Sequence, residues 1–77
     1  MTTVSITLNS IEKVKSFVNE IARFENDFDL ISGRYIIDAK SIMGIFSLDL
    51  SQSITLNIHA EENELPDILA SLEPYIA

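Results

Sequence analysis

The 77-residue sequence has no cysteine and no tryptophan, and it has a single histidine and only five basic residues. Without cysteine, the chain has no disulfide framework, no thiolate metal site and no cysteine nucleophile. Five lysines and arginines against twelve aspartates and glutamates give a net charge of −7 at pH 7. This charge repels phosphate backbones and anionic lipid headgroups, so we expect neither nucleic acid nor a membrane surface as a partner.

Targeting signals and long apolar runs are also missing. The first ten residues, Met-Thr-Thr-Val-Ser-Ile-Thr-Leu-Asn-Ser, contain no basic segment followed by an apolar one. No apolar run approaches the length of about 20 residues that spans a bilayer. One histidine among scattered carboxylates lacks the spacing of metal ligands, so no metal and no other cofactor is expected. These absences predict a cytoplasmic protein.

The composition that remains is typical of a folded domain. Hydrophobic residues make up 47% of the chain and charged residues 22%, with only two glycines and two prolines. A short chain without an internal repeat or a linker predicts a single domain over residues 1–77.

Hydrophobic periodicity predicts seven elements. Alternating apolar residues are typical of strands, and apolar spacings of three and four residues are typical of helices. A turn at Ser32-Gly33 joins two short strands as a hairpin. The predicted order is β-α-β-β-α-β-α, over residues 2–8, 10–24, 28–31, 35–37, 42–46, 54–60 and 65–76. Three helices with one-sided apolar stripes need one face of a four-stranded antiparallel sheet, so we predict an α+β open-faced β-sandwich.

The same periods predict which side chains are buried. The buried stripe of the first helix is predicted to be Ile11, Val14, Val18, Ile21 and Ala22. Asn9 and Ser10 precede this helix as candidate N-caps, and Asn9 with Glu12 resembles a capping box. On the last strand, Asn57 and His59 alternate with apolar residues, which predicts that both lie on the solvent face.

A stretch in the middle of the chain carries a more specific signal. Residues 38–50 read Asp-Ala-Lys-Ser-Ile-Met-Gly-Ile-Phe-Ser-Leu-Asp-Leu, and residues 53–56 read Ser-Ile-Thr-Leu. This stretch resembles the middle of HPr, the histidine-containing phosphocarrier of the bacterial sugar phosphotransferase system. The predicted order of elements is also that of HPr, and the similarity extends from about Val4 to the C-terminal helix. The resemblance implies the HPr fold, with three helices on one face of the sheet.

HPr proteins carry a phosphoryl group on a histidine in a Gly-x-His-x-Arg-Pro segment that follows the first strand. In this chain the corresponding segment is Asn9-Ser10-Ile11-Glu12-Lys13, with Ser10 nearest the histidine position and Glu12 nearest the arginine position. A phosphohistidine carrier needs an imidazole nucleophile and a cation beside the phosphoryl oxygens. We therefore expect a family member without the phospho-accepting histidine, with no catalytic residue and no enzymatic activity.

Ser41 matches a second functional residue of the family. In HPr and its catabolite-repression relatives from Gram-positive bacteria, HPr kinase/phosphorylase phosphorylates this serine for regulation. The family also docks its partners through the helix that follows, where the candidates are Ile42, Met43, Phe46 and Leu48. Relatives that lose the histidine and keep this serine are regulatory partners of a transcription factor. The resemblance thus implies a protein-binding regulatory module controlled at Ser41, and the alternative is that Ser41 is only the helix N-cap.

Other interpretations stay open at this point. Helical spacing requires Ile45 and either Ile42 or Phe46 to fill the core rather than a docking surface. One alternative function is a phosphocarrier component with an atypical acceptor such as His59. Another is a structural subunit that buries its second helix between copies. The sequence does not determine the oligomeric state.

Overall fold

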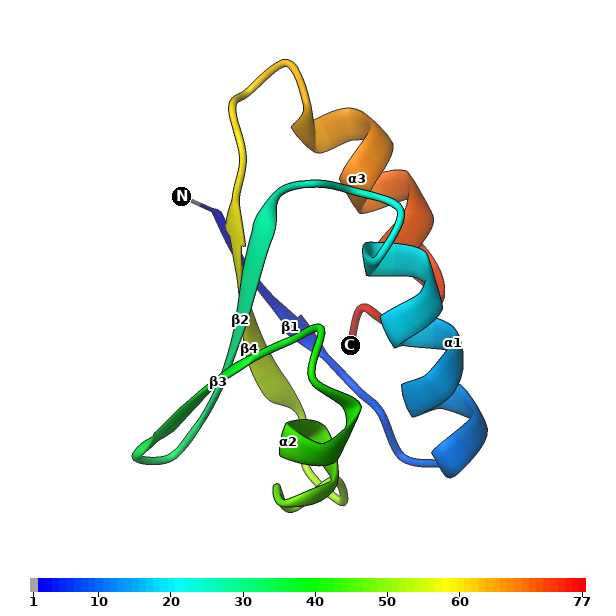
Figure 1. Ribbon diagram of the computed structural model, residues 1–77, viewed down its shortest axis with the longest axis vertical. Coiled ribbons are helices and arrows are strands. Elements are labelled where there is room, and N and C mark those ends of the chain that lie inside the picture. Colours follow the sequence, from blue (N-terminus) through cyan, green and yellow to red (C-terminus); the bar gives the residue numbers. More distant parts are fainter. Residues whose placement is uncertain (1) are drawn as a thin grey trace.

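The structure is a computed structural model that describes residues 2–77, and it has the predicted order of elements. Along this part of the chain the elements are β1 Thr2–Ile6, α1 Ile11–Ile21, β2 Asp27–Ser32, β3 Tyr35–Asp38, α2 Ile42–Phe46, β4 Ile54–His59 and α3 Leu65–Leu72, followed by a 3-10 helix over Glu73–Tyr75. The strands form one antiparallel sheet, and the α-helices lie on one of its faces (Figure 1). The predicted α+β open-faced β-sandwich is therefore confirmed.

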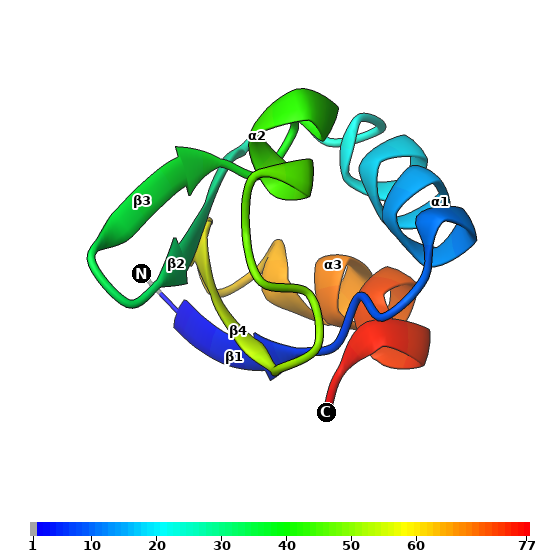
Figure 2. The ribbon, with the colours of Figure 1, turned by 90° about the horizontal axis from the view of Figure 1, so that it is seen from below.

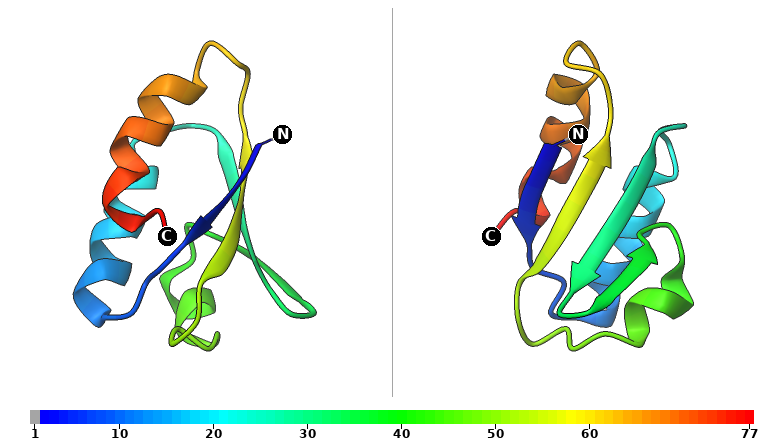
Figure 3. Two further views of the ribbon diagram at one scale, coloured as in Figure 1. Left: turned by 180° about the vertical axis from the view of Figure 1, so that it is seen from behind. Right: turned by 90° about the vertical axis from the view of Figure 1, so that its left-hand side faces the viewer.

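β4 occupies the middle of the sheet, whose strand order is β1-β4-β2-β3. Leu56 of β4 lies opposite Val4 of β1 and Leu30 of β2, so one face of these three strands is apolar. The right-hand view of Figure 3 shows the strands side by side, with β3 at one edge. A two-residue turn joins β2 to β3, and its Gly33 has a φ of 60°, a left-handed conformation that glycine adopts without strain.

The core lies between the sheet and the helices. It contains the buried residues Ile6, Leu8, Val14, Phe17, Ile21, Phe28, Leu30, Ala39, Ile45, Ile54, Leu56, Ile58, Ile68, Leu72 and Tyr75. Both α1 and α3 present several of these side chains, and Figure 2 shows the two helices next to each other. α2 contributes only Ile45. Much of the surface of α2 is therefore free for other contacts.

α1 is shorter than predicted. It ends at Ile21 instead of Phe24, because the N–H groups of Arg23 and Phe24 donate to carbonyls three residues earlier, at 3.3 and 3.1 Å, and so tighten the last turn. Phe24 then lies near Phe28, with 6.4 Å between the ring centres. At 11 residues α1 is the longest helix in residues 2–77, and none of the helices described there is long and apolar enough to cross a membrane.

Three of the burial predictions for α1 are wrong. Ile11 and Ala22 are exposed, because the first lies at the very start of α1 and the second lies just beyond its end. Phe17, which the predicted stripe omitted, is fully buried. Asn57 lies on the open face, as predicted, but it is only 8% exposed; its cross-strand neighbours on that face are Thr3 and Asp29.

The last helix also ends early, since α3 stops at Leu72 and not at Ile76. Pro74 has no backbone N–H and cannot continue an α-helix, and the chain tightens into the 3-10 turn. Beyond this turn, Ile76 forms an antiparallel bridge with Ile6 of β1. The C-terminal segment is therefore held against the end of β1, as the left-hand view of Figure 3 shows.

Tyr75 connects the C-terminal turn to α1. Its ring is almost fully buried and packs edge-on against Phe17, with 5.6 Å between the ring centres. Its hydroxyl is hydrogen-bonded to the hydroxyl of Ser16. The hydrogen bond and the ring contact together fix the C-terminal segment on the helical layer.

We predict that Tyr75→Phe lowers the free energy of unfolding by about 0.5–1.5 kcal/mol, because it removes a partly buried hydrogen bond and keeps the ring contact. Urea unfolding followed by circular dichroism measures this change. Tyr35→Phe is the matched control, since Tyr35 is 69% exposed and should tolerate the loss of its hydroxyl. An equal loss of stability in both variants would contradict the role assigned to Tyr75.

Candidate functional site

Ser41 is located where the chain leaves β3 and enters α2. Its backbone is extended, with a φ of −91° and a ψ of 102°, and its Oγ accepts a hydrogen bond from the Gly44 N–H at 3.2 Å. The Ser41 N–H donates to the carbonyl of Asp38 at 3.0 Å, which holds the turn before the helix. Ser41 is thus the N-cap of α2, and its side chain is exposed.

Gly44 keeps the space beside the Ser41 hydroxyl open. A Cβ atom at this position would lie 3.2 Å from the Ser41 Oγ and 3.3 Å from the Cδ1 of Ile37. Both distances are shorter than ordinary van der Waals contacts. Glycine therefore lets α2 approach β3 without crowding the hydroxyl that caps the helix.

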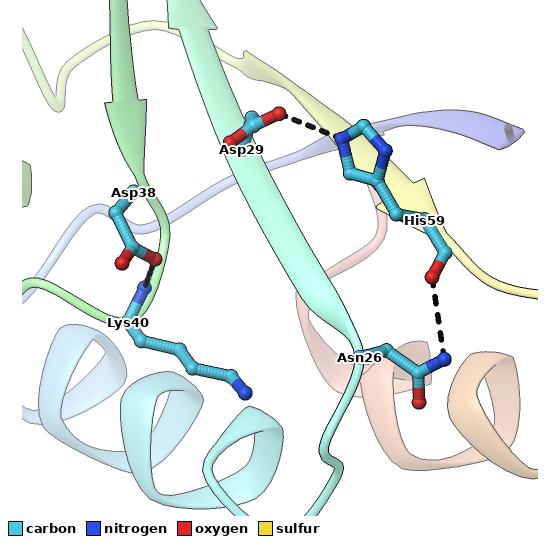
Figure 4. A network of polar contacts seen from close by, with 5 residues as sticks. All are labelled: Asn26, Asp29, Asp38, Lys40 and His59. Atoms are coloured by element: carbon cyan, nitrogen blue, oxygen red, sulfur yellow. Dashed lines mark hydrogen bonds and ion pairs between the residues drawn. The ribbon is translucent and has the colours of Figure 1, made fainter.

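Lys40 links the Ser41 turn to the rest of the fold. Its Nζ donates to the Phe24 carbonyl at 2.7 Å and lies 5.6 Å from the centre of the Phe28 ring. Its backbone N–H donates to the Asp38 Oδ1 at 2.9 Å, a contact that Figure 4 shows. The positive charge that precedes Ser41 in the chain is therefore directed toward the connection between α1 and β2.

The predicted docking residues divide into exposed and half-buried side chains. Met43 is 78% exposed and Phe46 is 40% exposed. Ile42 and Leu48 are half-buried and pack against the core, and Ile45 is fully buried. The structure therefore places Ile42, rather than Phe46, beside Ile45 on the core side of α2.

A shallow hollow lies between the end of α2 and the start of α1. It has a volume of about 470 Å³ and is lined by Asn9, Ser10, Ile11, Phe46, Leu50 and Ser51. Ile11 is 63% exposed and shares this hollow with Phe46, which lies three residues from Met43 on α2. We call Ile11, Met43 and Phe46 the apolar helix surface. The exposure of Ile11 could have been predicted from its position directly after the N-cap, because a side chain in the first helical position has no preceding helical turn to pack against.

Ser10 is the residue predicted from the sequence to lie nearest the histidine position of HPr. Its Oγ accepts a hydrogen bond from the Lys13 N–H at 3.1 Å, so Ser10 is the N-cap of α1. The capping box predicted for Asn9 and Glu12 is wrong, because the cap is one residue later. Glu12 is exposed in the first turn of the helix. The start of α1 therefore has a hydroxyl engaged in capping and a carboxylate next to it.

His59, the only histidine in the sequence, lies on the open face of the sheet, as predicted. Its Nε2 is 2.7 Å from the Asp29 Oδ2, and the Asn26 Nδ2 donates to its carbonyl at 3.2 Å (Figure 4). The register places Asp27 directly opposite His59, and Asp38 directly opposite Asp29. The imidazole is therefore paired with Asp29 and lies beside Asp27, with Asp38 one strand further away, and these carboxylates repel an anion at this position.

Asp49 follows α2 and is held in one conformation by Ser51. The Ser51 hydroxyl donates to the Asp49 Oδ1 at 2.6 Å and the Ser51 N–H donates to the same oxygen at 3.0 Å. These two hydrogen bonds, the first more than the second, lower the pKa of Asp49 below its usual value. Within the described part of the chain, no group of three histidine, cysteine or carboxylate side chains is arranged to hold a metal ion.

Comparison with known proteins identifies a family model and solved structures that are similar to this chain. The family model described as "PTS HPr component phosphorylation site" matches residues 12–77. The structure of HPr-C-His from Thermoanaerobacter tengcongensis is 28% identical, with a TM-score of 0.73 over 94% of this chain and 90% of that one. The phosphocarrier protein HPr from Bacillus anthracis str. Ames is 26% identical, with a TM-score of 0.71 over 99% and 94% of the two chains. The histidine-containing phosphocarrier protein of Mycoplasma shares the fold, with a TM-score of 0.70 over 95% and 86% of the two chains at 14% identity.

We predict that Ser41→Ala lowers the free energy of unfolding by about 1 kcal/mol, because it removes the hydrogen bond that caps α2, and that Ser41→Asp keeps most of this stability. Thermal and urea unfolding measure both changes. Ser53→Ala is the control, since Ser53 is exposed in the loop before β4. If Ser41→Ala and Ser53→Ala were equally stable, the cap would contribute nothing to the fold.

Proposed function

The chain belongs to the HPr component family of the phosphotransferase system, a family of phosphocarriers. Within this family we propose that it is a regulatory, protein-binding member whose phosphorylation site is Ser41. The observation that carries the proposal is the exposed Ser41 hydroxyl at the start of α2, two residues before the exposed side chain of Met43. A charge added at Ser41 lies next to a surface that a protein partner can contact.

The start of α1 supports a role without a histidine relay. Residues 9–13 contain no imidazole, and the Ser10 hydroxyl already accepts the capping hydrogen bond from Lys13. Glu12 adds a negative charge in the first turn, where the family places a cation. At a separation of a few ångströms, a screened repulsion of about 1–4 kcal/mol opposes a phosphoryl group there. The family match also begins at Glu12 and leaves Ser10 outside it.

The surroundings of His59 do not favour it as a replacement acceptor. Its Nε2 is paired with Asp29, and Asp27 and Asp38 add two more carboxylates on the same face. Phosphoryl transfer to an imidazole requires donors or cations that stabilise the phosphoryl oxygens. The aspartates instead repel them. The alternative function as a phosphocarrier with an atypical acceptor therefore has less support than the regulatory one.

Phosphorylation of Ser41 would change the surface charge without a change of fold. A phosphoserine carries a charge of about −1.5 to −2 at pH 7 and can accept several hydrogen bonds. The first turn of α2 has no acidic residue that would repel a phosphate. The Gly44 N–H, which donates to the Ser41 Oγ, is close enough to donate a hydrogen bond to a phosphate on Ser41. The new charge would recruit a partner with arginines and lysines, or repel an acidic one. By the resemblance of Ser41 to the regulatory serine of the family, we propose HPr kinase/phosphorylase or a transcriptional regulator as the partner.

We predict that HPr kinase/phosphorylase with ATP adds one phosphoryl group to this protein and none to Ser41→Ala, because the acceptor hydroxyl is exposed. Intact-mass spectrometry measures the addition. Ser10→Ala is the matched control, since it also removes a helix N-cap and leaves the acceptor in place. Equal modification of Ser41→Ala and the unmodified sequence would show that Ser41 is not the site.

We further predict that Met43→Ser lowers the kcat/KM of the Ser41 phosphorylation by about tenfold, because it removes the most exposed apolar side chain of α2. Initial rates at several concentrations of the protein measure the effect. The control Ile36→Ser removes an exposed apolar side chain from β3 and should react like the unmodified sequence. A loss of similar size in the control would mean that the kinase does not use the apolar helix surface specifically.

A further inference from the structure

The outer edge of β3 is open to a further strand. β3 is the last strand of the sheet, whereas the opposite edge is partly covered by the C-terminal segment, where the Ala77 N–H donates to the Ser5 carbonyl at 2.9 Å. Figure 2 shows the hairpin of β2 and β3 extending away from α1 and α3. The four residues of β3, Tyr-Ile-Ile-Asp, include no lysine and no proline, which commonly protect edge strands. Such an edge can pair with a strand of another chain.

The backbone of β3 has groups that face this open edge. Ser32 and Tyr35 flank a two-residue turn and therefore form a hydrogen-bonded pair in the ladder. The next pair, Ile31 and Ile36, is then of the non-hydrogen-bonded kind, which turns the N–H and C=O of Ile36 outward. The side chains of Tyr35 and Ile36 are each 69% exposed. Backbone groups and apolar side chains are thus both available at this edge.

The charges along β3 make the strand complementary to itself. Arg34 lies just before the strand and Asp38 at its end, with Ile36 midway between them. Within residues 2–77, Arg34 makes no ion pair, and the Asp38 carboxylate accepts a hydrogen bond only from the Lys40 N–H. When such a strand pairs antiparallel with a copy of itself, each positive end meets a negative end.

We propose that two copies of this chain associate by pairing their β3 strands antiparallel about a twofold axis at Ile36. The Ile36 residues of the two copies then face each other and exchange two backbone hydrogen bonds. Tyr35 faces Ile37 of the second copy, and Arg34 faces Asp38 of the second copy, each contact occurring twice by symmetry. The two sheets become one continuous sheet, and both apolar helix surfaces remain outside the contact.

The backbone and the charges together select this register. A shift by one residue would align the outward backbone groups of Ile36 with groups that already bond to β2. A shift by two residues would either place Arg34 opposite Lys40, which is also positive, or place Asp38 beyond the end of the paired strand. Because the strand has only four residues, the contact is small, so the dimer is weak and the fraction of dimer rises with protein concentration.

Sedimentation velocity from micromolar to millimolar concentration tests this dimer. We expect the unmodified chain to dimerise as the concentration rises, and we expect Ile36→Lys to raise the dissociation constant by about tenfold or more, because two positive charges then face each other at the axis. Circular dichroism checks that the variant remains folded. Ile11→Lys is the matched control, since it places the same charge on an exposed residue of the apolar helix surface and should leave the dissociation constant unchanged.

Charge reversal tests the register. Arg34→Asp places two aspartates at each end of the contact and Asp38→Arg places two arginines there, so each variant alone should remain monomeric. An equimolar mixture of the two should dimerise again, since every charged pair in the mixed dimer is attractive. A monomer at all concentrations, a dimer that Ile11→Lys disrupts and Ile36→Lys does not, or a mixture that stays monomeric would each overturn the proposal.

Discussion

The two-sided pairing of β4 is the constraint on which the other parts of this fold depend. β1 and β2 bond to its two edges, and Ile54, Leu56 and Ile58 all turn toward the helices. A register shift of one residue would expose these three side chains and bring Asn57 and His59 into the core. α1 and α3 bury their apolar stripes against this face, so their positions follow from the register of β4.

Because the core is built on β4, α1 and α3, the short helix α2 contributes little to it. A helix of five residues is not stable on its own, and α2 is held by the Ser41 cap and by one buried side chain, Ile45. Met43 is therefore not required by the core, and Ser41 remains at the surface although it stabilises the helix. A charge placed on Ser41 alters the outer surface of the protein and leaves the packing around β4 intact. This separation between the core and the surface is what makes a regulatory role physically reasonable.

Local periodicity predicts the fold wherever apolar residues recur on one face of an element and that face is buried. The apolar face of β4 could be predicted from the sequence for this reason, and the Ser41 cap could be predicted because a serine directly precedes a short apolar stretch. Periodicity alone does not predict the exposure of Ile11 and Asn57, because the end of a helix and the neighbours of a central strand decide it. The contact of His59 with Asp29 is also beyond local prediction, since the two residues are separated by 30 positions and meet only through the pairing of β2 with β4.

The central claim is that this chain keeps the HPr fold without a phosphoryl relay through histidine. The most direct measurement is the intact mass of the protein after incubation with Enzyme I and phosphoenolpyruvate, with a histidine-bearing HPr as the positive control. The mass should stay unchanged, because residues 9–13 contain no imidazole and the carboxylates of Asp29 and Asp27 lie beside His59. The addition of one phosphoryl group to this chain, and its loss in His59→Ala, would contradict the claim.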